Sequence, residues 1–197
     1  MKDPGQCLDA FIADARRVQA LFFDENRERI LEAAGTIAAR LRDGGKVLLF
    51  GNGGSAADAQ HIAAEFVGRF GPDRPAIPAL SLAADPSVVT ALGNDYGFAK
   101  VFARQIEAMG RAGDTAVAIS TTGNSPNVLE GLETARTAGL YTVGFTGNSG
   151  GKMSDLADVV FRVPSTVTPR IQEAHIALGH FLAELIDRDL YPAAYDE

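Results

Sequence analysis

The sequence predicts an α/β protein: a three-layer αβα sandwich with a five-stranded parallel sheet, preceded by N-terminal helices. Five short apolar runs alternate with helix-length segments, as in parallel sheets that carry helices on both faces. The runs lack polar alternation, which is typical of strands buried on both faces. The 21 glycines concentrate in the loops between these segments. Together these observations favour one α/β unit.

The chain opens with a helical segment. Residues 6–43 alternate apolar and charged side chains at helical spacing and predict two amphipathic helices, the second ending at Gly44 and Gly45. Because these helices precede the α/β unit, their apolar stripe needs another surface. We therefore expect one domain over 1–197, with a helical oligomerisation segment (1–43) and an α/β core with the C-terminal helix (44–197).

The remaining elements follow in order along the chain. The predicted strands are the apolar runs 46–50, 76–82, 115–120, 141–146 and 159–163. The predicted helices are 55–69, 97–109, 125–138 and 168–190. In such sheets, ligands bind beyond the carboxyl ends of the strands, where loops lead into helix N-termini.

Composition narrows the function classes. The chain has 197 residues and a net charge of -7, which disfavours a nucleic-acid or anionic membrane surface. No apolar run is long enough for a membrane span or a signal peptide, so we expect a cytoplasmic protein without membrane or nucleic-acid partners. The single cysteine, Cys7, excludes an internal disulfide and a cysteine-rich metal site. A metal would need histidine, carboxylate or amide ligands.

A glycine-rich loop, Gly51–Ser55, follows the first predicted strand. Its glycines let backbone N–H groups approach a ligand, and the helix start that follows favours oxyanions. The loop lacks the third glycine of a dinucleotide fingerprint and the Gly-Lys-Ser/Thr of a P-loop. Ser55 and Asp58 also have the spacing of a capping box. A tight turn with a helix cap therefore stays an equal alternative.

The third strand leads into a loop dense in hydroxyl groups. Ser125 has the position of an N-cap, and Pro126 that of the first helical residue. A capped turn explains these two residues but not Ser120, Thr121 and Thr122. Hydroxyl groups and backbone donors at one helix start can hold a phosphate without lysine or arginine, so we favour a phosphate site.

Two predicted helices carry polar groups opposite their apolar stripes. His61 and Glu65 are four residues apart and therefore neighbours, although a solvated pair is the alternative. Gln172 and His180 likewise point away from the stripe of the last helix, whereas His175 lies at its edge and is predicted to be structural. Gln172 and His180 are separated by roughly 12 Å along the helix. A shared small site needs converging side chains or a neighbouring chain.

With these residues in place, the sequence resembles the sugar isomerase (SIS) domain family over nearly its whole length, and within it the isomerases of a seven-carbon sugar phosphate. The segments that carry the resemblance are Gly51–Ser55 with Asp58, His61 and Glu65, then 93–95, 120–125, 146–147, 150–153, 170–173, His175 and His180. Thr122 stands where serine is usual, and Pro169 where some members carry an acidic residue that serves as an accessory acid.

The resemblance implies conversion of the ketose D-sedoheptulose 7-phosphate into the aldose D-glycero-D-manno-heptose 7-phosphate, the first step toward the heptose of bacterial surface polysaccharide such as lipopolysaccharide. It also implies a homotetramer with active sites at subunit interfaces. The implied phosphate ligands are Ser120, Thr121, Thr122 and Ser125. The implied sugar ligands are Asn52, Gly53, Gly54, Ser55, Glu65, Asn94, Asp95 and Gln172. Some members bind zinc, one ion per subunit, at positions matching His61, Glu65, Gln172 and His180.

Isomerisation through an enediol needs one group that takes a carbon-bound proton and one that manages the proton on oxygen. The resemblance gives these roles to Glu65 as base and His180 as acid, with zinc polarising the carbonyl. Because a zinc-bound glutamate is a poorer base, we expect Glu65 to shift during turnover. The alternative is a non-catalytic SIS-domain adaptor that binds the replication initiator. Such adaptors lack this pair, so we favour the enzyme.

Overall fold

The computed structural model describes residues 3–195, and its strands form one parallel sheet in the order β2-β1-β3-β4-β5. The parallel pairing of all neighbours confirms the predicted sheet. The strands are β1 (Val47–Gly51), β2 (Ala79–Ser81), β3 (Thr115–Ile119), β4 (Tyr141–Thr146) and β5 (Val159–Arg162).

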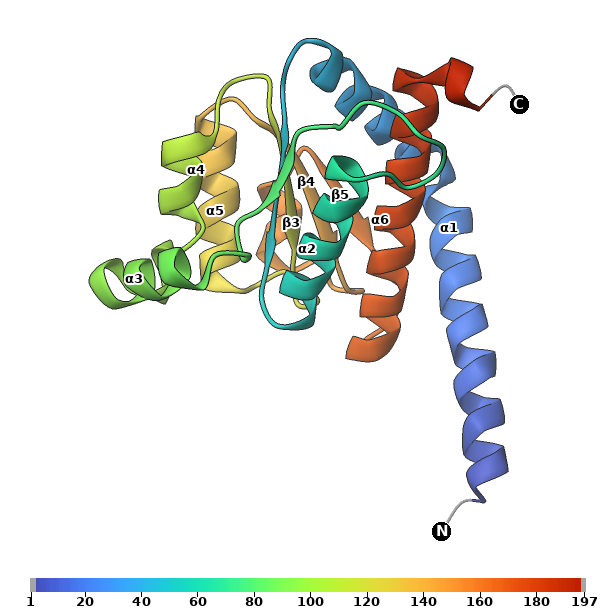
Figure 1. Ribbon diagram of the computed structural model, residues 1–197. Helices are drawn as coiled ribbons and strands as arrows, with labels where there is room; N and C mark the ends of the chain where they lie inside the picture. Colours follow the sequence, from blue (N-terminus) through green and yellow to red (C-terminus); the bar gives the residue numbers. More distant parts are fainter. Residues whose placement is uncertain (1–2, 196–197) are drawn as a thin grey trace.

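Helices cover both faces of the sheet, as expected (Figure 1). The α-helices are α1 (Pro4–Arg42), α2 (Gly54–Val67), α3 (Pro86–Tyr96), α4 (Ala103–Met109), α5 (Pro126–Thr137) and α6 (Thr168–Leu190), with 3-10 turns at Phe98–Lys100, Gly151–Asp155 and Pro192–Ala194. One apolar core lies between the sheet and α1, α2 and α6, and the other lies under α4 and α5. Within 3–195, no helix is long and apolar enough to cross a membrane.

The prediction of two N-terminal helices is wrong, because α1 is one continuous helix of 39 residues. Its central stretch contains neither glycine nor proline. Asparagine side chains often disfavour a helix interior because they hydrogen-bond to nearby backbone groups. Here Asn26 is buried, and its side-chain amide donates to the carbonyl of Phe22 at 2.8 Å, which is compatible with the helix. The helix therefore passes through the point where the pattern changes. Its N-terminal half extends beyond the rest of the molecule (Figure 1).

Three further elements differ from the prediction. The helix predicted over 97–109 is a 3-10 turn, Phe98–Lys100, followed by the short helix α4. Helix α3 was not predicted, although Asp85 caps it by accepting the N–H groups of Ser87 and Val88 at 2.8 and 3.2 Å. Its apolar stripe of Val88, Val89 and Leu92 is short and only partly buried, so the sequence marks this helix weakly. Strand β2 is three residues long instead of seven, because Pro78 directly before it has no N–H to donate to the sheet.

The strand order places a topological switch point between β1 and β3. The chain leaves β1 for β2 on one side and leaves β3 for β4 on the other. The loops after β1 and β3 lead into α2 and α5, which pack in different apolar cores. Ligands of open α/β sheets bind in the crevice at such a point. Both loops that the sequence singled out therefore meet at the expected binding edge.

Candidate active site

Helices α2 and α6 lie side by side and run in the same direction. Gly54 faces Gln172 at their first turns, and Ile62 faces Gly179 two turns later. A Cβ atom at Gly179 would lie 2.3 Å from Cδ1 of Ile62, so the helices approach this closely only because residue 179 is glycine. This packing brings His180 of α6 next to the polar face of α2.

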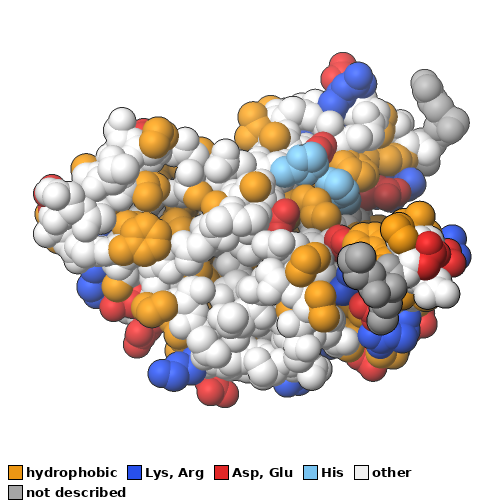
Figure 2. All heavy atoms as spheres, turned by 90° about the horizontal axis from the view of Figure 1, so that it is seen from below, with side chains coloured by type: hydrophobic (Ala, Val, Ile, Leu, Met, Phe, Trp, Pro, Cys, Tyr) orange, Lys and Arg blue, Asp and Glu red, His pale blue; other side chains and the backbone are white. Residues whose placement is uncertain are grey.

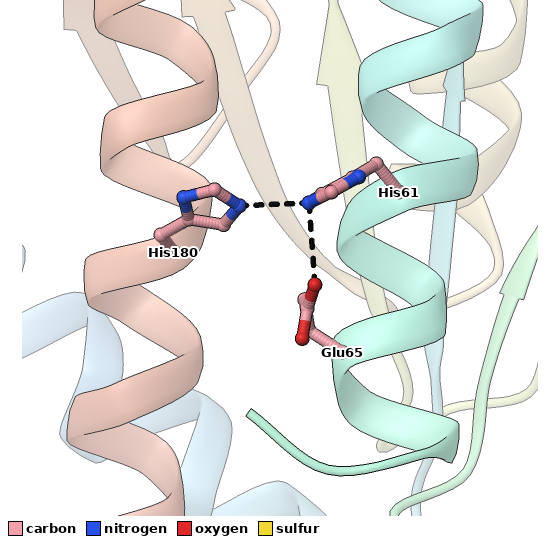
Figure 3. Close-up of side chains that lie close together, drawn as sticks. All are labelled: His61, Glu65 and His180. Atoms are coloured by element: carbon pink, nitrogen blue, oxygen red, sulfur yellow. Dashed lines mark hydrogen bonds and ion pairs between the residues drawn. The ribbon is translucent and has the colours of Figure 1, made fainter. Parts of the chain in front are cut away.

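His61, Glu65 and His180 form a cluster at the surface of these two helices (Figure 3). The Nε2 atoms of His61 and His180 are 2.9 Å apart, and His61 Nε2 lies 3.2 Å from Oε1 of Glu65. One donor atom from each residue lies within 4.8 Å of the others. The side chain of His61 is 53% exposed, so the cluster is open to a ligand; Figure 2 shows histidines on this face beside apolar side chains.

Gln172 lies at the other end of the same helix face. A Cβ atom at Gly54 would be 2.3 Å from the Gln172 side-chain nitrogen, which places this amide against the glycine-rich loop. Along α6, Gln172 precedes His180 by eight residues, or roughly 12 Å. Within one chain the structure thus brings three of the four predicted metal ligands together and places Gln172 against the glycine-rich loop.

The predicted capping box of Ser55 and Asp58 is wrong. Helix α2 begins after Gly53, whose φ of 56° is in the left-handed region, and no side chain caps it. Ser55 is buried within the first turn of α2 and does not occupy the N-cap position, so its hydroxyl does not cap the helix. Asp58 is half-buried, and burial raises the pKa of its carboxyl to about 6, against the opposing charge of His61. The helix start is left free for a ligand.

The hydroxyl-rich loop after β3 is folded on itself. Ser120 Oγ is 3.0 Å from Ser125 Oγ and 3.5 Å from Thr122 Oγ1. Ser125 stands at the predicted N-cap position of α5, but its side chain makes no capping bond. Its hydroxyl pairs with Ser120 instead, so the loop gathers hydroxyl groups around one helix start, as a phosphate site requires.

Asn127, which the sequence did not single out, lies against one of the predicted ligand loops. It is buried on α5 and exchanges two amide hydrogen bonds of 2.8 Å with Asn52 of the glycine-rich loop. The pair joins the two predicted ligand loops across the switch point. The available signal was an asparagine directly after Ser125 and Pro126. Its amide lies at the start of a helix that was already expected to border a ligand site.

The predicted sugar ligands Asn94 and Asp95 lie on α3. Both are exposed, and the Asn94 amide donates to the Asp95 carboxylate at 2.8 Å. Among the described residues, no recorded hydrogen bond joins this pair to the loops after β1 and β3. Their role in sugar binding stays a prediction.

His175 is a structural residue, as its position at the edge of the apolar stripe indicated. It is fully buried, with its ring 5.7 Å from that of Phe145 and its Nε2 atom 3.2 Å from the carbonyl oxygen of Thr146. The carbonyl accepts, so Nε2 carries the proton of the neutral ring. Burial lowers the pKa of His175 to about 4.

This burial predicts a pH dependence of stability. Unfolded His175 takes up a proton near pH 6.5, whereas the folded residue does so only near pH 4, so its contribution is lost as the pH falls through this window. Relative to His175→Gln, the wild-type free energy of unfolding should fall by about 2 kcal/mol between pH 7 and pH 4.5. Denaturant unfolding at matched concentrations measures it, and parallel pH curves would contradict it.

Comparison with known families agrees with the fold. The SIS domain family matches residues 10–147 of the chain. This defines the class: the glycine-rich loop, His61, Glu65 and the hydroxyl-rich loop all lie within the matched segment of a SIS domain.

More specific relatives narrow the class. The chain is 53% identical to the phosphoheptose isomerase of Aquifex aeolicus over 88% of this chain and 91% of that protein. The phosphoheptose isomerase GmhA from Neisseria gonorrhoeae superposes with a TM-score of 0.88 at 41% identity, covering 94% of this chain and 99% of that one. A phosphoheptose isomerase from Francisella tularensis superposes with a TM-score of 0.91 at 33% identity, covering 95% of this chain and 100% of that one. The chain belongs to the phosphoheptose isomerase family of SIS-domain proteins.

Proposed function

We propose that the protein interconverts D-sedoheptulose 7-phosphate and D-glycero-D-manno-heptose 7-phosphate through an enediol. The observation that carries this proposal is the cluster of Glu65, His61 and His180 on the surface of a SIS domain. Relatives named phosphoheptose isomerase, at about half identity over most of the chain, support it. The product would supply the heptose of a bacterial surface polysaccharide, and we place the reaction in the cytoplasm.

Glu65 and His180 divide the proton transfers. Glu65, whose side chain is 23% exposed, takes the proton from the carbon next to the carbonyl, and His180 manages the proton on the substrate oxygens. His61 lies between the two side chains and contacts both. At the other end, Ser120, Thr121, Thr122 and Ser125 hold the phosphate, with Asn52, Gly53, Gly54, Ser55, Asn94, Asp95 and Gln172 along the sugar.

The donor set of the cluster fits zinc. Tetrahedral bonds of about 2.0–2.1 Å place ligand atoms roughly 3.3 Å apart, close to the 2.9 and 3.2 Å between His61 Nε2 and its two neighbours. We propose one zinc ion per subunit on His61, Glu65 and His180, with Gln172 joining from a neighbouring chain. When bound, zinc polarises the substrate carbonyl as a Lewis acid. The chain's own residues orient the sugar and move the protons.

Removal of the metal should test this assignment. We expect chelator-treated protein to lose most of its isomerase activity and to regain it with stoichiometric zinc. Direct titration should give one zinc per chain, falling sharply in His61→Gln. Full activity of the stripped protein, with no response to zinc, would rule out the Lewis-acid role.

A homotetramer would cover the exposed side of α1. Leu8, Phe11 and Leu31 on this helix are each at least half exposed. A groove of about 430 Å³ between α1 and α6 is lined by Phe23, Asp24, Arg27, Ile30, Leu31 and Phe181. Phe181 directly follows His180, so a neighbouring chain seated here would lie beside the proposed active site. A mass in solution of four chains, by sedimentation, checks the assembly.

The decisive test is incubation with sedoheptulose 7-phosphate. We expect an aldoheptose phosphate as product, detected by chromatography with mass spectrometry and NMR. Absence of product with the wild-type protein would contradict the proposal. The non-catalytic adaptor gains no support from the relatives above, which are named as isomerases, or from the site, which holds Glu65 and His180 together.

A further inference from the structure

Arg74 closes the end of α2 that carries Glu65. It lies in the loop between α2 and β2, and its side chain is only 1% exposed. Its guanidinium donates to the carbonyl oxygens of Glu65 at 2.8 Å, Phe66 at 2.8 Å and Gly68 at 2.9 Å. The last carbonyls of a helix lack partners within the helix, and a cation there also suits the helix dipole. Arg74 therefore fixes the backbone of Glu65 directly.

The same guanidinium reaches across to α6. Its Nε donates to Oδ2 of Asp187 at 3.1 Å, and Asp187 is fully buried. The other carboxylate oxygen of Asp187 has no partner among the described residues. Burial raises the pKa of Asp187, Arg74 opposes this rise, and the charge of Glu65 adds to it. Asp187 thus depends on Arg74 and lies within electrostatic range of Glu65.

These contacts form one continuous link. Glu65 precedes the end of α2 by two residues, and His180 precedes Asp187 by seven residues, or about two turns of α6. Both helices that carry the cluster are therefore tied to a single buried side chain. An ordinary helix cap would need the carbonyl contacts alone, and a bond to the second helix adds nothing to capping.

We propose that Arg74 and Asp187 are positioning residues, a buried clamp that sets the spacing of α2 and α6 and so holds Glu65 opposite His180. The inference rests on the proposed isomerase function. Neither residue touches the reacting atoms. A displacement of about 1 Å at a reacting group can cost on the order of 100-fold in rate, so loss of the clamp affects turnover more than binding.

The key variant is the double substitution Arg74→Met with Asp187→Leu. Either single substitution leaves an uncompensated buried group and lowers Tm, whereas apolar residues in place of both recover much of that loss. We expect kcat of the double variant to stay about 10- to 100-fold below wild type, with KM within about 3-fold. Arg74→Lys keeps the charge but loses the fork of carbonyl bonds, and should give an intermediate kcat in a folded protein.

Lys46→Met is the matched control. It removes the ion pair with Asp114, which lies at the opposite end of β1 from the site. We expect a lower Tm with unchanged kcat. If kcat of the clamp variants simply followed Tm, so that the double variant regained both, the positioning role would be overturned.

Histidine NMR gives a readout that does not depend on turnover. The chain has three histidines, and the rings of His61 and His180 have centroids 5.0 Å apart, whereas His175 is buried elsewhere in α6. In the double variant we expect the cross-relaxation between His61 and His180 to weaken, with the His175 signals unchanged. An inter-ring contact retained at wild-type strength would overturn the clamp. Wild-type protein without isomerase activity would instead refute the proposed function and leave this test valid.

Discussion

Glu65→Gln is expected to abolish most of the isomerase activity. The substitution keeps the size of the side chain and an oxygen that can still face His61, but it removes the carboxylate that takes the carbon-bound proton. Loss of a positioned general base typically costs 10²- to 10⁴-fold, and we expect kcat to fall within this range. Initial rates of aldoheptose phosphate formation, with Tm measured in parallel, check the prediction.

Two further variants complete that experiment. His180→Gln should show a loss of similar size, because it removes the partner that handles the oxygen proton. Glu184→Gln is the matched control: Glu184 lies on α6 and pairs with Arg188 at the surface, and such pairs contribute little. Full activity in both Glu65→Gln and His180→Gln would disprove the assigned roles.

Gly123→Ala is expected to disrupt the proposed phosphate site. Gly123 has a φ of 65° and lies in the hydroxyl-rich loop, packed against the loop that follows β4. An added Cβ would lie 2.0 Å from the carbonyl oxygen of Gly150 and 2.8 Å from Oγ1 of Thr146. Backbone atoms cannot move aside as a flexible side chain does, so the loop itself must shift. We expect KM to rise at least about 10-fold, since a misplaced buried-site donor typically costs 1–3 kcal/mol.

Gly44→Ala separates backbone strain from this collision. Gly44 also has a positive φ, of 86°, but an added Cβ would meet no atom within 4 Å. It should lose some stability from strain and keep the KM of the wild type. The affinity for inorganic phosphate, from calorimetric titration, should fall in Gly123→Ala alone, and equal values in both variants would contradict the assignment.

The sheet could be predicted from sequence because its strands are continuous apolar runs. Strand β4 begins and ends at the predicted residues, and the strands beside it agree to within one residue at either end. The helices depended on weaker signals. Helix α3 has only a short, partly buried apolar face, so its periodicity is a weak signal, and α1 continues through a region where only its pattern changes.

Some contacts of the candidate site could likewise be predicted from sequence, and others could not. The pairing of His61 with Glu65 could be predicted, because the two residues are four positions apart on one helix. Their contact with His180 follows from the parallel packing of α2 on α6, and this depends on Gly179 giving room to Ile62. The role of Ser55 as a cap failed because Gly53 turns the chain before the helix begins. The parallel sheet predicted which loops meet at one edge, but the side-chain contacts between distant helices depend on packing that no local pattern specifies.

The paired amides of Asn52 and Asn127 have a thermodynamic consequence. Each side chain donates to the other, so the glycine-rich loop and the start of α5 are coupled mechanically. Free energy released when the substrate phosphate binds at the proposed site beside α5 is therefore available to order the glycine-rich loop along the sugar. Remote binding of a non-reacting group can in this way lower the barrier at the reacting carbons, and a substrate analogue without its phosphate should lose turnover as well as affinity.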